Sequence, residues 1–131
     1  MSITGGGNEM SKPKLLIVDD EVNQGLLYQQ ELEDEGYEIV VVDSGKRAID
    51  EVKENNFDLV VLDIGMPEMD GLETLGRLLG IDNKIPVILC TAYPSYKDNF
   101  MSWAADAYVV KSMDLTELKD RIKESLAKKQ N

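Results

Sequence analysis

Four apolar runs in this sequence are followed by residues that could bind a cation or a phosphoryl group. These residues are Asp19-Asp20, Asp63, Thr91 and Lys111. Carboxylate oxygens suit a hard cation such as Mg²⁺, and the chain has no His to favour a softer metal. The Asp63 carboxylate could also attack a phosphorus centre and form an aspartyl phosphate. A lysine ammonium and a threonine hydroxyl could then stabilise the phosphoryl oxygens.

Each of these residues also has a more ordinary explanation when taken alone. Asp19, Asp20 or Thr91 could cap a helix, Asp63 could be a loop carboxylate, and Lys111 could be a solvated charge. The combination favours a site, because clustered carboxylates repel one another. Two like charges 4 Å apart cost roughly 4 kcal/mol at an effective dielectric constant near 20. A divalent cation or a lysine would offset that repulsion.

Short apolar runs alternate with helix-period segments along the chain. The predicted strands are residues 15–18, 37–42, 59–62, 87–90 and 108–110, which are apolar on both alternations. Helices are predicted at 22–35, which Gly36 would terminate, and at 44–54. A third helix would begin after an N-cap at Asp70, and a short or irregular one would span 94–104. The last helix is predicted from the apolar stripe Leu115, Leu118, Ile122 and Leu126. Strands that alternate with helices in this way are typical of βαβ units.

This alternation predicts an α/β fold with a five-stranded parallel sheet, right-handed crossovers and helices on both faces. Sites in such doubly wound sheets lie at the carboxyl ends of the strands. We therefore expect the acidic residues, Thr91 and Lys111 to meet in one pocket. Residues 1–11 contain a Gly triplet and are predicted to be a flexible leader, so the domain would span residues 12–129.

Composition excludes several classes of function. The 14 Lys and Arg against 25 Asp and Glu give a net charge of −11, which argues against direct nucleic-acid binding. The absence of His excludes His-based triads, His metal sites and phosphohistidine chemistry. The single Cys fits a reducing compartment. No apolar run reaches the roughly 18 residues of a membrane span, so we expect a cytoplasmic protein without membrane insertion.

Four motifs resemble the receiver domain of bacterial two-component response regulators, including the chemotaxis-regulator type. They are LIVDDE at 16–21, LVVLDIGMPEMDG at 59–71, TA at 91–92 and YVVK at 108–111, and the resemblance covers about residues 14–128. It implies a flavodoxin-like (βα)5 fold with strand order 2-1-3-4-5. It also implies that Asp63 is the phosphoacceptor and that Thr91 and Lys111 contact the phosphoryl group, with Tyr108 as a switch residue.

The same resemblance implies a cofactor and partners. Mg²⁺, with Mn²⁺ as an alternative, would be bound by Asp20, Asp63 and the backbone carbonyl of Gly65, with Asp19 acting mainly through a water molecule. A histidine kinase or phosphotransfer protein would supply the phosphoryl group. The domain would catalyse only its own phosphorylation and dephosphorylation, and would not be an enzyme in the usual sense.

An unknown output protein is expected to bind a face made by the fourth helix, the fifth strand and the last helix. The apolar members of that face would be Tyr96, Phe100, Met101 and Trp103, although simple core packing explains these residues equally well. We predict a stand-alone receiver domain, since only Lys128 to Asn131 follow the last predicted helix. Excision from a longer regulator remains open.

Two departures from the receiver pattern bear on the site. The family usually has Pro after the lysine, commonly with a cis peptide bond, whereas this chain has Ser112. A cis bond before a residue other than Pro costs about 2.5–4 kcal/mol, so the geometry of the Lys111–Ser112 peptide is left open. Gly65 offers no side chain over the phosphoryl site while Tyr93 offers a bulky one, which leaves the phosphate lifetime open.

Three other functions are compatible with parts of the pattern. A phosphatase similar to the haloacid dehalogenases would need an acidic residue two positions after Asp63, where this chain has Gly65. In a flavodoxin-like cofactor binder, the residues Asp19-Asp20-Glu21 would repel the flavin phosphate. A receiver-like module that binds a partner constitutively is opposed by the intact acidic residues, Thr91 and Lys111, but Ser112 leaves it open.

Overall fold

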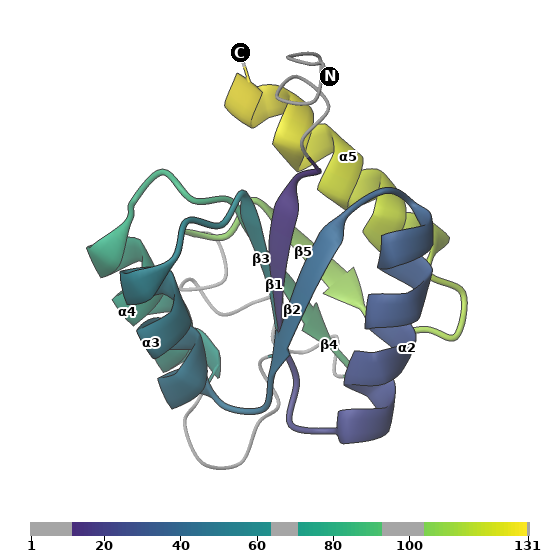
Figure 1. The fold of residues 1–131 in the computed structure, drawn as a ribbon, viewed down its shortest axis with the longest axis horizontal. Coiled ribbons are helices and arrows are strands. Elements are labelled where there is room, and N and C mark those ends of the chain that lie inside the picture. The colour runs from purple at the N-terminus through teal and green to yellow at the C-terminus, as the bar shows by residue number, and fades with distance from the viewer. Residues whose placement is uncertain (1–11, 64–70, 93–103, 131) are drawn as a thin grey trace, which may run out of the picture.

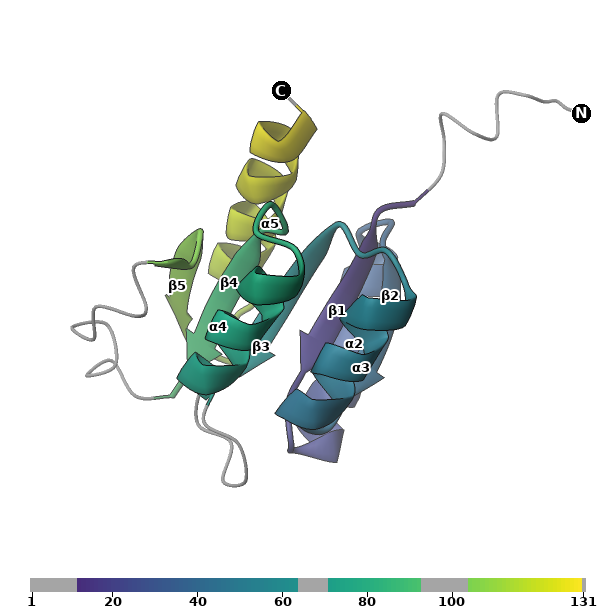
Figure 2. The same cartoon turned by 90° about the vertical axis from the view of Figure 1, so that its left-hand side faces the viewer.

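The computed structural model describes residues 12–63, 71–92 and 104–130. Within these ranges, five parallel strands form one sheet in the order β2-β1-β3-β4-β5, which confirms the predicted fold class and strand order. Helices cover both faces of the sheet (Figure 1, Figure 2). The predicted leader, the N-cap at Asp70 and all but the last residue of the predicted helix 94–104 lie outside the described residues.

The five strands lie where the apolar runs predict them. They are β1 (Lys14–Val18), β2 (Glu38–Val42), β3 (Leu59–Asp63), β4 (Val87–Thr91) and β5 (Ala107–Val110). The prediction that β2 begins at Tyr37 is wrong by one residue. The Tyr37 N–H donates to the Leu32 carbonyl at 3.3 Å and so belongs to the turn that ends the preceding helix.

Four helices are present in the described ranges, and local signals in the sequence explain their ends. They are α2 (Val22–Asp34), α3 (Gly45–Glu54), α4 (Gly71–Ile81) and α5 (Thr116–Gln130). The Ser44 hydroxyl accepts a hydrogen bond from the Arg47 N–H at 3.2 Å and caps α3. Gly36 follows α2 with a φ of +97°, the left-handed conformation in which Gly commonly terminates a helix.

Each face of the sheet carries its own hydrophobic core, because successive strand side chains point to opposite faces. Figure 1 shows α3 and α4 on one side of the sheet and α2 and α5 on the other. Leu16, Val60 and Leu89 pack toward α3 and α4. Ile17 and Val61 pack toward α2 and α5. This double burial explains why the strands have no polar alternation.

The register of the sheet brings the strand ends to one edge. Val18 pairs with Leu62, and Asp63 at the end of β3 pairs with Cys90. Thr91, the last residue of β4, pairs with Val110 of β5. Among the described helices, none is long and apolar enough to span a membrane.

Candidate functional site

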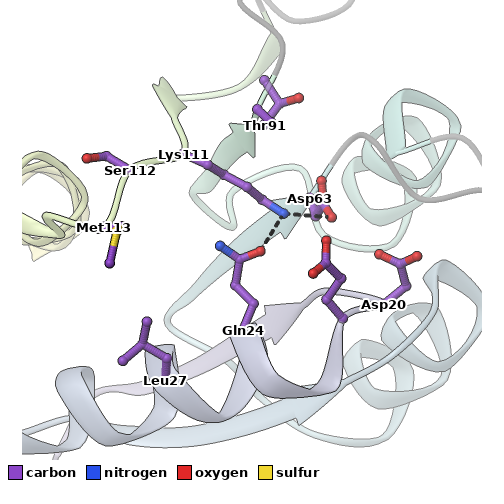
Figure 3. Close-up of a pocket in the computed structure, with 10 residues that line it drawn as sticks. Asp20, Gln24, Leu27, Asp63, Thr91, Lys111, Ser112 and Met113 are labelled. Carbon is purple, nitrogen blue, oxygen red and sulfur yellow. Dashed lines mark hydrogen bonds and ion pairs between the residues drawn. The ribbon is translucent and has the colours of Figure 1, made fainter.

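The carboxyl edge of the sheet holds a pocket of about 420 Å³. Asp20, Asp63, Thr91 and Lys111 line it, so the structure brings together residues from four predicted positions (Figure 3). Asp63 and Thr91 end β3 and β4, while Asp20 and Lys111 lie in the loops that follow β1 and β5. The volume is that of a small-molecule site rather than of a packing defect.

Three carboxylates meet in this site. Asp19, Asp20 and Asp63 each present an oxygen, and these atoms all lie within 4.8 Å of one another. Asp19 and Asp63 are buried, at 2% and 6% exposure, whereas Asp20 is exposed to solvent. The Glu21 N–H donates to Asp19 Oδ1 at 2.9 Å, which fixes the orientation of this carboxylate.

Lys111 supplies the positive charge of the site. Its Nζ atom lies 3.1 Å from Asp63 Oδ2 and 3.3 Å from Asp19 Oδ2, and its side chain is only 12% exposed. The same ammonium donates to Gln24 Oε1 at 3.1 Å. The Lys111 backbone N–H donates to the Thr91 carbonyl at 2.6 Å, which ties the lysine to the end of β4.

The pKa shifts of Asp19 and Lys111 follow from burial and from neighbouring charges. Burial raises the pKa of Asp19 above its ordinary value, and the hydrogen bond from Glu21 and the charge of Lys111 offset only part of that rise. Burial alone would lower the pKa of Lys111, but the negative charges of Asp63 and Asp19 outweigh it, so the pKa is raised. Lys111 therefore stays protonated at neutral pH and continues to balance the carboxylates.

A neutral layer lies beneath the charged edge. The Tyr28 hydroxyl and the Cys90 sulfur are buried and lie 3.6 Å apart. Burial raises the pKa of the Cys90 thiol to about 11 and also raises the pKa of Tyr28. Both groups are uncharged at neutral pH, so they do not compete with Lys111 or the carboxylates for counter-charges.

Three further predicted residues have distinct positions. Tyr108 lies in β5, half-buried against the core under α3 and α4, and pairs with Leu89. Because Tyr108 is two residues before Val110, the partner of Thr91, it is a diagonal neighbour of Thr91 on one sheet face. The Lys111–Ser112 peptide bond is trans. Gly65, predicted to contribute a backbone carbonyl, lies outside the described residues.

The chemistry of the donor set fits a hard divalent cation. The described part of the cluster offers oxygen ligands only, and Asp20 faces solvent from which a cation can enter. Mg²⁺ keeps several of its waters and requires few protein carboxylates, so three aspartates are sufficient. The residues therefore suit Mg²⁺ better than a metal that prefers nitrogen or sulfur ligands.

The sequence analysis missed Gln24, which contacts the ammonium of Lys111 and lines the pocket. Gln24 lies in the first turn of α2, four residues after Asp20. The first turn of α2 directly follows the loop that carries Asp19 and Asp20, so a polar residue at this position was a signal for the site. This position alone does not reveal that the partner of Gln24 is Lys111 in the loop after β5, 87 residues away.

A doubly wound sheet with three aspartates and a lysine at its carboxyl edge is the arrangement that the resemblance to receiver domains implies. In agreement, the model of the response regulator receiver domain family matches residues 15–123. The chain belongs to this family, and it is a receiver domain of the two-component response regulator type. The resemblance found in the sequence motifs is thereby confirmed.

Relatives of known name extend this assignment. YkoG, an uncharacterized transcriptional regulatory protein of Bacillus subtilis, is 39% identical over 119 residues, which cover 89% of this chain and 52% of YkoG. Sporulation initiation phosphotransferase F of the same organism is 36% identical, with 93% of this chain and 100% of that protein covered. This chain therefore spans about half of the first relative and all of the other. The first is named for transcriptional regulation and the second for phosphotransfer in the initiation of sporulation.

A solved structure is also similar. The response regulator TrrA of Thermotoga maritima, in complex with Mg²⁺-BeF, is 43% identical with a TM-score of 0.84, covering 86% of this chain and 98% of that one. TrrA has also been solved in complex with the histidine kinase ThkA, where it is 44% identical to this chain, with a TM-score of 0.82 and coverage of 87% and 98%.

Proposed function

We propose that this chain accepts a phosphoryl group on Asp63 from a histidine kinase or a phosphotransfer protein and then changes its affinity for an output protein. The observation that carries the proposal is the 3.1 Å contact between Lys111 Nζ and Asp63 Oδ2 within a cluster of three carboxylates. A nucleophile, a cation site and a fixed positive charge thus lie in one pocket. TrrA, solved both with Mg²⁺-BeF and with a histidine kinase, supports the choice of chemistry and donor.

In the proposed step, an oxygen of the Asp63 carboxylate attacks the phosphorus atom of the donor. A new O–P bond forms, and the bond from phosphorus to the donor's imidazole nitrogen breaks. The electron pair of that bond stays on the nitrogen. The donor's other ring nitrogen carries a proton, so the leaving group is neutral imidazole. Lys111 stabilises the negative charge on the phosphoryl oxygens during the transfer.

Asp20 and Asp63 would hold Mg²⁺ directly, together with the Gly65 carbonyl, and Asp19 would act mainly through a water molecule. Mn²⁺ has similar oxygen preferences and is the alternative ion. When bound, the cation neutralises charge on the phosphoryl oxygens and on the carboxylates. Asp19 and Asp63 are already held by Lys111, so the chain's own residues orient the nucleophile before any ligand arrives.

Thr91 would bind a phosphoryl oxygen through its hydroxyl, and Tyr108 would follow its movement as the switch residue. The two are diagonal neighbours on one sheet face, which supports such coupling. The output face would then include β5 and α5, with no direct binding of nucleic acid by this acidic domain. Tyr96, Phe100, Met101 and Trp103, the predicted apolar members of that face, lie outside the described residues.

The domain would act in the cytoplasm, where kinases that use ATP can supply its donor. It would catalyse only its own phosphorylation and dephosphorylation, in keeping with relatives such as YkoG that are named as transcriptional regulatory proteins. The domain would span residues 12–129, and the predicted leader at 1–11 lies outside the described residues.

The test is intact mass spectrometry after incubation with a small acyl phosphate and Mg²⁺. We expect one phosphate adduct in the wild type and none in Asp63→Asn or in the presence of EDTA. Asp106→Asn is the matched control, because Asp106 lies at the opposite edge of the sheet and should leave the adduct unchanged. Absence of an adduct in a wild-type chain that binds Mg²⁺ would contradict the proposal and favour a constitutive binding module.

A further inference from the structure

The ammonium of Lys111 has an acceptor for each of its three N–H bonds. Asp63 Oδ2 lies 3.1 Å away, Asp19 Oδ2 lies 3.3 Å away and Gln24 Oε1 lies 3.1 Å away. A lysine ammonium has three donors and no acceptor, so these contacts use its full capacity. In the unphosphorylated site, Lys111 thus has no N–H left for a phosphoryl oxygen.

The three acceptors differ in charge. Asp19 and Asp63 are carboxylates that also form ion pairs with Lys111, whereas the Gln24 amide is neutral. Hydrogen bonds between two ionised groups are stronger than those in which one partner is neutral. If the ammonium must exchange one acceptor for another, Gln24 is the acceptor whose release costs least.

On this basis we propose that Gln24 is a positioning residue, which holds Lys111 in the unphosphorylated site and releases it when a phosphoryl oxygen arrives. The proposal rests on the proposed function and goes beyond it, because it assigns to α2 a residue that sets how readily the site accepts a phosphoryl group. Figure 3 shows Gln24 reaching from α2 toward the Lys111 ammonium. Gln24 lines the pocket itself, so its side chain has space to move once released.

The direction of the expected effect follows from differential binding. A contact that is present in the resting site and absent in the transition state raises the barrier, so its removal speeds the reaction. A hydrogen bond to a charged group has a net value of about 1.5–3 kcal/mol, and we therefore expect Gln24→Met to accelerate phosphorylation about tenfold or more. Met has a similar length and helix propensity, so α2 should be retained.

Gln24→Glu should act in the opposite direction. A carboxylate of the same length would hold the Lys111 ammonium more strongly and would add a negative charge next to the incoming phosphoryl group. We expect this variant to be phosphorylated at least about tenfold more slowly than the wild type. A merely structural role for Gln24 would predict losses in both variants or no effect in either, so opposite signs are the diagnostic result.

The experiment measures the rate of adduct formation by mass spectrometry, with a small acyl phosphate and saturating Mg²⁺. Wild type, Gln24→Met and Gln24→Glu are compared with Gln30→Met, an exposed position on the same helix that does not line the pocket. A second readout needs neither metal nor phosphate. Side-chain ¹⁵N NMR of the lysine ammonium groups in the metal-free chain should show faster proton exchange at Lys111 in Gln24→Met only.

Each outcome bears on a different claim. A faster Gln24→Met, a slower Gln24→Glu and an unchanged Gln30→Met support the inference. A wild type that forms the adduct while Gln24→Met is equal or slower overturns it, because Lys111 would then keep Gln24 and give up a carboxylate instead. Unaltered proton exchange at Lys111 in Gln24→Met overturns the resting contact. No adduct in any variant overturns the proposed function, and this inference with it.

Discussion

The two edges of the sheet use aspartate in different ways. At the amino edge, Asp58 precedes β3 and Asp106 precedes β5. Each of them both accepts a hydrogen bond from, and donates one to, the backbone of the first residue of the neighbouring strand. The Lys14 N–H donates to Asp58 Oδ2 at 2.7 Å, and the Asp58 N–H donates to the Lys14 carbonyl at 2.8 Å. The Val87 N–H donates to Asp106 Oδ2 at 2.9 Å, and the Asp106 N–H donates back at 2.8 Å.

At the carboxyl edge, by contrast, three carboxylates lie around one ammonium. Asp19, Asp20 and Asp63 offer oxygens within 4.8 Å of one another, and Lys111 forms ion pairs with only two of them. Asp58 and Asp106 at the amino edge therefore each satisfy a backbone donor and fix strand register, while the three described aspartates around Lys111 outnumber its single ammonium. Aspartate at the first edge serves folding, and at the second edge it is available to a ligand.

The largest expected effect comes from removal of the positive charge at the carboxyl edge. Lys111→Met should lower the free energy of unfolding by about 3 kcal/mol in buffer with EDTA, because it leaves buried carboxylates without a counter-charge. Urea unfolding followed by circular dichroism measures this change. Addition of Mg²⁺ should restore part of the loss, since a cation that binds only the folded state stabilises it.

Lys123→Met on α5 is the control for this prediction. Lys123 Nζ lies 3.4 Å from Glu35 Oε1, and its side chain is 61% exposed. Exposed ion pairs contribute little, so we expect a change below about 1 kcal/mol that Mg²⁺ does not alter. Equal losses in Lys111→Met and Lys123→Met would contradict the view that the carboxyl edge depends on its lysine.

A smaller effect is expected at the amino edge. Asp106→Ala leaves the Val87 N–H, at the start of a fully buried strand, without its acceptor, which should cost about 2 kcal/mol. Asp106→Asn retains a carbonyl oxygen and should cost less than half as much. Both variants should form the phosphate adduct at the wild-type rate, and a slowed adduct would show that the two edges are not independent. Urea midpoints and intact mass provide the two measurements.

The sequence predicts the fold and the composition of the charged edge for a physical reason. Strands covered on both faces must be apolar at every position, and parallel strands place their carboxyl ends together. Asp19, Asp63 and Lys111 could thus be brought together on paper, before any distance was known. The same reasoning could not predict the role of Asp58 or Asp106, because an acidic residue before a strand is also common as a solvated charge.

Gln24 shows a second limit of sequence reasoning. Its position in the first turn after the acidic loop can be predicted from the sequence. Its hydrogen bond depends on how far two flexible side chains reach, one from α2 and one from the loop after β5. Side-chain conformation of this kind is set by packing and charge in the folded state. The one-residue error at Tyr37 has a similar origin, since its N–H is used by the end of α2 rather than by the sheet.

The smallest expected effect also gives the sharpest contrast between the edges, because its sign reverses. Asp20 is exposed, and its repulsion by Asp19 and by Asp63 costs about 1 kcal/mol per pair in water. Attraction to the N-terminus of α2 offsets roughly 0.3–1 kcal/mol of this cost. Asp20→Asn should therefore raise the free energy of unfolding by about 1 kcal/mol in EDTA. The corresponding change at Asp106 lowers it. Asp50 is exposed on α3, so Asp50→Asn is the control and should leave the free energy of unfolding unchanged.

Mg²⁺ should invert the order of stability of wild type and Asp20→Asn. A ligand at 100 times its dissociation constant stabilises the folded state by about 2.7 kcal/mol, which wild type should gain in full and Asp20→Asn only in part. The variant would then be more stable than wild type in EDTA and less stable in Mg²⁺, as measured by urea unfolding in both buffers. An Asp20→Asn chain that is destabilised in EDTA would place Asp20 with the structural aspartates of the amino edge. The excess of carboxylates at the carboxyl edge would then not serve to bind a cation.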